Sequence, residues 1–185
     1  MKRTLKGQFG YIKNQRKIEL AKTLIMLALC VATYYIGIFS TGSNKNLLTF
    51  VAILGVLPMA KFAVSTVLFS KAKGCSEELH EKLISNNVTV NFYDLYMTAY
   101  KSSFAFSAVV YGKDSLVFLS EDEKLNENEA KAHVEQVLRN ISVENVTVKI
   151  FIDSDKFIER AKQLNDGGIE EMPTVIADNI LSVSI

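Results

Sequence analysis

The sequence predicts a membrane protein in which a two-helix transmembrane hairpin precedes a small α+β domain of element order αβββαβα. Three observations predict this fold class. Two apolar stretches, about residues 18–39 and 47–69, lie close together near the start of the 185-residue chain. Positive charges flank these stretches, whereas the later part of the chain is acidic. After residue 75, runs rich in β-branched and aromatic residues alternate with runs of helical periodicity.

Each apolar stretch is long enough to cross a bilayer as a helix, since a hydrocarbon core of about 30 Å requires about 20 helical residues. The first stretch has no charged residue from Leu24 to Phe39, and Glu19 and Lys22 lie at its start. The second stretch is charged only at Lys61. Residues 40–46, STGSNKN, are polar and suit a tight reversal. The two helices are therefore expected to lie side by side.

The positive charges predict the orientation of the hairpin. Seven Lys or Arg residues lie within residues 2–22, and Lys71 and Lys73 follow the second stretch, whereas the connecting loop contains only Lys45. Basic flanks stay on the cytoplasmic side, so we expect a multi-pass protein of the cell membrane with both termini cytoplasmic. A cleaved signal peptide competes for the first stretch, but no A-x-A-like cleavage site follows it.

Charge divides the chain into two chemically different parts and, together with the apolar stretches, predicts a basic cytoplasmic arm (1–17), the hairpin (18–73) and a cytoplasmic α+β domain (74–185). Residues 1–75 contain eleven Lys or Arg and one acid, whereas residues 76–185 contain ten Lys or Arg and nineteen acids. The basic flanks are therefore expected to contact anionic lipid, and the bilayer is the first expected partner. No nucleic acid is expected as a partner, because the domain has no basic surface pattern.

The domain begins with a predicted helix over residues 76–86, with Ser76 as its N-cap and acids in its first turn. Residues 88–100, 103–111 and 115–120 are rich in β-branched and aromatic residues and are predicted to be strands. In the second strand, alternation predicts one face formed by Phe104, Phe106, Ala108 and Val110. The sheet is expected to be mixed or antiparallel, with helices packed on it.

The second half of the domain, from residue 125 onward, is predicted to contain a helix, a strand and another helix. Asn126 and Glu129 have capping-box spacing at the start of a helix over residues 125–141. Residues 146–153 alternate as a strand, and a helix then runs from Asp153 or Ser154 to the pair Gly167-Gly168. For the tail, residues 167–185, a short final strand and a loosely ordered chain are both left open.

This element order matches that of restriction-endonuclease-like nucleases, which makes a membrane-tethered metal-dependent hydrolase or nuclease one functional alternative. Such nucleases need an acid on one central strand and an acid-x-Lys group on the next, because the metal and the lysine meet at the phosphate. The two candidate strands contain no acid. Asp122 and Lys124 have the right spacing but follow the strand, and Asp94 would have to reach them from the preceding strand. A solvated acidic turn is the plainer interpretation.

Other catalytic patterns are absent from the sequence. It contains no G-x-x-x-x-G-K-[ST], no G-x-G-x-x-G and no G-x-S-x-G, so phosphate cradles and nucleophile elbows are unsupported. His80 and His133 lie on separate predicted helices, and Ile84 stands where a zinc-peptidase helix would need its second ligand. We therefore assign no catalytic, cofactor-binding or metal-binding residue, and the balance of these observations disfavours an enzyme.

Lys61 is the most unusual residue of the predicted hairpin, because it follows the helix-bending Pro58 in the middle of an apolar stretch. A cation at this depth costs several kcal/mol, so it must reach the surface, find a partner or mark a functional path. Three interpretations compete: a span that ends near Lys61, a local pair with Glu19, and a pair with an acid of a partner protein.

The leading functional hypothesis is an interaction or regulatory protein that displays an acidic α+β domain at the membrane. Its expected partner is another protein or a second copy of this chain. Besides the hydrolase alternative, a third hypothesis is a small accessory subunit of a membrane complex that binds through its two helices.

Overall fold

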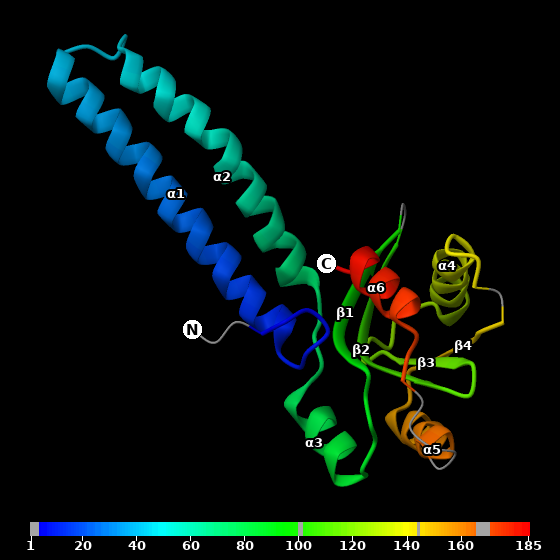
Figure 1. Ribbon diagram of the computed structural model, residues 1–185. Helices are drawn as coiled ribbons and strands as arrows, with labels where there is room; N and C mark the ends of the chain where they lie inside the picture. Colours follow the sequence, from blue (N-terminus) through cyan, green and yellow to red (C-terminus); the bar gives the residue numbers. More distant parts are fainter. Residues whose placement is uncertain (1–3, 100–101, 144, 166–170) are drawn as a thin grey trace. The chain divides into compact units, whose positions relative to one another are not determined.

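The computed structural model describes residues 4–99, 102–143, 145–165 and 171–185 (Figure 1). These residues form two compact units. The first, here called the helical hairpin, is Lys13–Lys71. The second, the sheet domain, combines the described residues up to Ile12 with Ala72–Ile185. Residues 4–12, which the sequence suggested were part of a separate basic arm, therefore belong to the sheet domain.

The helical hairpin consists of α1 (Tyr11–Thr41) and α2 (Leu47–Lys71). At 1.5 Å per residue these helices are about 46 and 38 Å long. Each is long and apolar enough to cross a membrane, and only 6% of the most apolar window of each is buried. The two helices approach each other closely at Gly55 and Gly37, where there is no room for a larger residue. A Cβ at Gly55 would lie 2.8 Å from Cys30 Sγ, and one at Gly37 would lie 2.9 Å from Leu48 Cβ. The first helix starts seven residues earlier than the sequence indicated.

The sheet domain contains one mixed four-stranded sheet with strand order β1-β2-β3-β4. Its strands are β1 (Phe92–Thr98), β2 (Ser103–Gly112), β3 (Ser115–Leu119) and β4 (Thr147–Phe151). The first three form an antiparallel meander, and β4 lies parallel to β3. A parallel neighbour requires a crossover, which α4 (Glu127–Arg139) supplies. The expected order αβββαβα is found from residue 77 to residue 165, with one further helix after it, and of the two expected kinds of sheet the structure has the mixed one.

Helices cover both faces of the sheet (Figure 1). On one face, α4 and α6 (Thr174–Val183) pack against Leu95, Phe106 and Phe118. On the other, α3 (Glu77–Ser85) and α5 (Ser154–Asn165) pack against Val110 and Val117. Burial of these two apolar layers is the main stabilising contribution to the domain.

The helix starts follow the expected capping. Ser76 Oγ accepts the N–H of Leu79, as predicted for the N-cap of α3. Asn126 Oδ1 accepts the N–H of Asn128 and Glu129 at the start of α4. The Asn126 side-chain amide also donates to the Glu129 carboxylate at 3.1 Å. In a standard capping box the Glu129 carboxylate would instead accept the backbone N–H of Asn126.

The prediction that one face of β2 carries Phe104, Phe106, Ala108 and Val110 is wrong. Phe104 and Phe106 face α4 and α6, whereas Ala108 and Val110 face α3 and α5. The phase changes where β1 and β2 skip one pair, between Tyr93↔Ala108 and Leu95↔Phe106. Asp94 occupies the skipped position with a left-handed φ of 54°. A local irregularity of this kind re-aims the side chains that follow it.

The tail also differs from both expectations. Residues 174–183 form helix α6, and only Ser184 forms an isolated bridge, to Met97. Ile176 and Ile180, which lie about one turn apart on this helix, are buried in the core that α4 also covers. The predicted Gly167-Gly168 stop of α5 lies outside the described residues.

Candidate functional site

Asp94 lies at the point where the sheet domain holds the two chain segments that lead into and out of the hairpin. Its side chain is buried, with 1% of the residue exposed. One carboxylate oxygen accepts the N–H of Cys75 at 2.6 Å, and the other accepts the N–H of Ile12 at 3.3 Å. The backbone N–H groups of Gly10 and Tyr11 also donate to this carboxylate. We call these five residues the Asp94 junction.

The Asp94 junction supplies what the start of α1 lacks. The first turn of a helix has N–H groups without helical partners and a partial positive charge. The first turn of α1 contains no acid of its own. Asp94, 82 residues later in the chain, provides the negative charge and the acceptors there. The left-handed backbone of Asp94 is costly for most residues and is tolerated best by Asp, Asn and Gly.

The electrostatics of the junction oppose nucleophilic chemistry at Cys75. Burial raises the pKa of the Cys75 thiol to about 12, and the charges of Glu121 and Asp94 contribute in the same direction. A thiol with this pKa stays protonated at neutral pH and is a poor nucleophile. Burial also raises the pKa of Asp94, although its four backbone donors act in the opposite direction. The Asp94 carboxylate is thus occupied by backbone N–H groups, and the Cys75 thiol beside it is unreactive, so the junction fixes the position of the backbone at residues 10–12 and 75.

Residues 5–10 dock on the outer edge of β1 and complete this attachment. The carbonyl of Gly7 accepts the N–H of Tyr93 at 2.7 Å, and the ring of Phe9 stacks on His80 at a centroid distance of 3.8 Å. Lys6 donates to the carbonyl of Ser184. Burial lowers the pKa of Lys6. The edge strand is thus covered by the protein's own chain, which protects it from pairing with other molecules.

A hollow of about 360 Å³ lies where β3 and β4 end, which is the usual place for ligands in folds with parallel strands. Ser76 donates to the Glu121 carboxylate at 2.5 Å, and Ser107 donates to the same carboxylate at 2.8 Å. Across the hollow, Lys82 Nζ lies 2.9 Å from Ser154 Oγ and 2.8 Å from an oxygen of Asp155. Glu121 and Lys82 are therefore engaged with neighbouring side chains, and the carboxylates of Glu78 and Glu123 also line the hollow.

The residues of the nuclease alternative each have other partners in the structure. Asp94 is engaged with the backbone of the junction. Asp122 lies 3.8 Å from Lys73 and accepts the N–H of Lys124 at 3.3 Å, which is the geometry of a surface turn. Throughout the described part of the chain, no three His, Cys, Asp or Glu side chains are grouped so that they could hold a metal ion.

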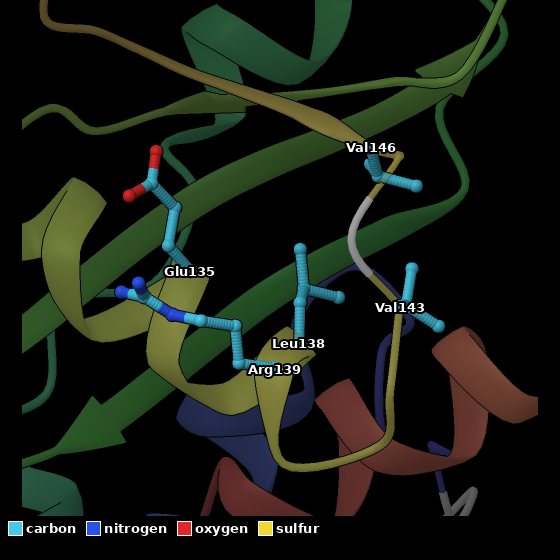
Figure 2. Close-up of a pocket in the computed structure, with 5 residues that line it drawn as sticks. All are labelled: Glu135, Leu138, Arg139, Val143 and Val146. Carbon is cyan, nitrogen blue, oxygen red and sulfur yellow. The ribbon is translucent and has the colours of Figure 1, made fainter.

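Another hollow, of about 370 Å³, opens beside the C-terminal half of α4 (Figure 2). Glu135, Leu138 and Arg139 of α4 line one side, and Val143 and Val146 of the following loop line the other. Figure 2 shows the Glu135 and Arg139 side chains extending from successive turns of the helix. Glu135 pairs with Lys131 at 3.8 Å. With one acid, one base and a shallow apolar floor, this hollow lacks the converging polar groups of a catalytic pocket.

Within the helical hairpin, Glu19 is 6% exposed and is held by its own helix. Lys22 Nζ lies 2.7 Å from its carboxylate, and Gln15 donates to it at 3.1 Å. The hydroxyl groups of Thr23 and Thr66 lie 3.2 Å apart and link α1 to α2. The sequence raised a pair between Glu19 and Lys61, but the described contacts join Glu19 to Lys22.

Lys61 and Pro58 both lie on the exposed surface of α2. Among the described residues, no carboxylate lies within ion-pair distance of Lys61. Pro58 has no N–H, so the carbonyl of Leu54 lacks its usual helical donor. The structure thus leaves an unpaired cation on an apolar helix face.

Sequence reasoning did not identify the docking of residues 5–10 or the role of Asp94. These contacts join residues that are 70 to 180 positions apart, and no local pattern signals them. The two glycines at 7 and 10, with φ of 83° and 79°, were the only local sign of a special backbone path.

No known protein family, no curated protein and no solved structure matches this chain.

Proposed function

We propose that this chain is a membrane-anchored interaction protein. The helical hairpin crosses a bilayer twice, and the sheet domain is displayed at the cytoplasmic face, where both termini lie. The single observation that carries this proposal is the distribution of exposed apolar side chains. Of the 23 large apolar side chains that are exposed in the described residues, 20 lie on α1 and α2. A surface this apolar is stable in lipid and would aggregate in water.

The basic residues at the base of the hairpin support the same orientation. Lys13, Arg16, Lys17, Lys71 and Lys73 are exposed near the ends of α1 and α2 that join the sheet domain. Each cation near an anionic leaflet contributes about 1 kcal/mol of attraction. The acidic sheet domain is repelled by the same leaflet, which would leave its surface open to a protein partner.

The Asp94 junction supports an interaction role more than the nuclease alternative. A catalytic carboxylate needs an oxygen free for a metal or a proton. The Asp94 carboxylate instead accepts backbone N–H groups from both chain segments next to the hairpin. In this role it holds residues 10–12 and Cys75 within the sheet domain.

Extraction of membranes that contain the full-length chain tests the proposal. At alkaline pH in carbonate, an integral hairpin stays in the membrane pellet, and a peripheral protein is released. A matched variant with Leu27→Lys, Leu54→Lys and Leu57→Lys carries three cations on exposed apolar positions. We expect the wild-type chain to stay in the pellet and this variant to lose insertion, because each central Lys costs about 3 kcal/mol. Release of the wild-type chain into the supernatant would refute the anchor.

The accessory-subunit alternative is favoured by one specific observation, the unpaired Lys61 on the exposed face of α2. It is compatible with the anchor, since the same hairpin can span the membrane and bind a partner there.

A further inference from the structure

We propose that the face of α2 around Lys61 binds a transmembrane helix of another protein that carries an Asp or Glu at the matching depth. This inference rests on the proposed function, because it requires the hairpin to lie in a bilayer. The face consists of Leu54, Leu57, Lys61, Val64 and Leu68, which recur at spacings of three and four residues. We call it the Lys61 face.

The Lys61 face points away from α1. Its four apolar members are exposed by 48% at Leu54, 70% at Leu57, 60% at Val64 and 37% at Leu68. The residues of α2 that contact α1, such as Gly55 and Thr66, lie on the opposite side of the helix. A helix can therefore pack on the Lys61 face without displacing the first one.

No group inside the hairpin is placed to neutralise Lys61. Thr23 lies opposite Thr66, and Cys30 lies opposite Gly55, so Lys61 is level with about Met26 on α1. Glu19 is then about seven residues away along the helix axis, or roughly 11 Å. It is also already engaged with Lys22 at 2.7 Å.

The direction in which α2 runs makes it harder for the Lys61 ammonium to reach the nearer membrane surface. Thr66 is level with Thr23, next to the first charges of α1, so Lys61 lies about five residues, or roughly 8 Å, deeper in the apolar region. Side chains on a helix tilt toward its N-terminus. Because α2 starts at the distal loop, this tilt directs Lys61 toward the interior of the bilayer, whereas snorkelling would require the opposite direction.

Charge complementarity selects the partner. An unpaired ammonium at this depth costs several kcal/mol, and a carboxylate beside it removes much of that cost. A second copy of this chain is the wrong partner, because a two-fold symmetric contact on this face would bring two Lys61 side chains together. A helix of a different protein with one Asp or Glu satisfies both the apolar flanks and the charge.

Synthetic transmembrane helices provide the test. The probes are three polyleucine helices with identical flanks and a single central Glu, Gln or Leu, reconstituted at pH 8 with the full-length chain in neutral phosphatidylcholine vesicles. Association is measured by energy transfer between dyes on the two components. We expect the Glu helix to associate about tenfold more strongly than the Leu helix, consistent with interhelical polar contacts in bilayers. The Gln helix should be intermediate.

Three variants identify the residue responsible. Lys61→Leu should abolish the preference for the Glu helix, whereas Lys71→Leu, which removes a lysine at the end of the same helix, should retain it. Lys61→Glu should reverse the preference toward a helix with a central Lys. Equal association of all three probes with an inserted wild-type chain would overturn the inference and leave the membrane anchor intact. A chain that fails to insert under carbonate extraction would overturn both.

Discussion

Replacing Asp94 tests whether this carboxylate fastens the sheet domain to the segments next to the hairpin. Asp94→Ala removes the acceptor of four backbone N–H groups, from Gly10, Tyr11, Ile12 and Cys75. Each buried donor left unpaired costs about 1–3 kcal/mol, and Ala at a left-handed φ adds about 1 kcal/mol. Relief of the buried charge offsets part of this cost. We therefore expect a loss of about 3–5 kcal/mol in the free energy of unfolding of the domain.

Asp94→Asn is the matched control, since Asn tolerates the left-handed backbone and keeps one acceptor oxygen. It should cost about 1–3 kcal/mol. The assay is thermal unfolding of the full-length protein in mild detergent, followed by tyrosine fluorescence, because the chain has no Trp. Asp94→Ala should lower Tm by about 10–20 °C. Hydrogen exchange at the Ile12 and Cys75 amides should accelerate in both variants well below Tm. A Tm within about 2 °C of wild type, with unchanged exchange at these two amides, would refute the role of the junction.

The pH dependence follows from the same group. Because burial raises the pKa of Asp94 above its ordinary value of 3.8, the folded chain binds this proton more readily than the unfolded chain. The stabilisation that comes from protonation of Asp94 is therefore fully present below pH 3.8 and is lost as the pH rises through its folded pKa, whereas the hydrogen bonds from the backbone N–H groups persist. On acidification from pH 7, wild type should gain stability relative to Asp94→Asn. A difference between the two proteins that does not change with pH would contradict the raised pKa.

Three further predictions concern other parts of the chain. Gly55→Cys should form a disulfide with Cys30 on mild oxidation, because a Cβ at residue 55 lies 2.8 Å from Cys30 Sγ; gel mobility after thiol blocking detects it, and absence of the bond would contradict the packing of the hairpin. Gly7→Ala should lower the free energy of unfolding by about 1–3 kcal/mol, because its Cβ would lie 2.7 Å from the Phe92 ring at a φ of 83°; thermal unfolding measures this, and an unchanged Tm would show that residues 5–10 do not dock there. With Cys30 replaced by Ser, Cys75 should react with iodoacetamide at pH 8 at least about 100-fold more slowly in the folded than in the unfolded chain, because the folded thiol has a pKa of about 12; equal rates would contradict its burial.

The elements of the sheet domain could be predicted because their signals are local. The N-caps at Ser76 and Asn126 and the apolar stripe Phe157, Ile158, Ala161 and Leu164 of α5 depend on residues within a few positions of one another. The two long apolar helices are recognisable for the same reason. Composition and spacing therefore predicted most of the element order, including the crossover helix before β4.

The parts that the sequence did not predict depend on distant contacts. The change of phase in β2 arises at the skipped pair beside Asp94, and no property of residues 103–112 signals it. Helix α6 forms because Ile176 and Ile180 enter a core built by strands 60 to 80 residues earlier. Asp94 was considered as a metal ligand because carboxylates on strands often serve that purpose, yet its partners here are backbone N–H groups. The sequence does not show which groups lie next to Asp94 in space, and this information was needed to assign its role.

Cysteine accessibility in intact cells tests the central claim most directly. With both native cysteines replaced by Ser, a single Cys is placed either at Gly42, in the loop between α1 and α2 where a Cβ meets no atom within 4 Å, or at Lys113, in the exposed turn between β2 and β3. A membrane-impermeant maleimide is then added to intact or permeabilised cells. The proposed anchor predicts that Gly42→Cys is labelled in intact cells and that Lys113→Cys is labelled only after permeabilisation. Labelling of both positions, or of neither, in intact cells would contradict a hairpin that crosses the membrane twice and displays its sheet domain inside.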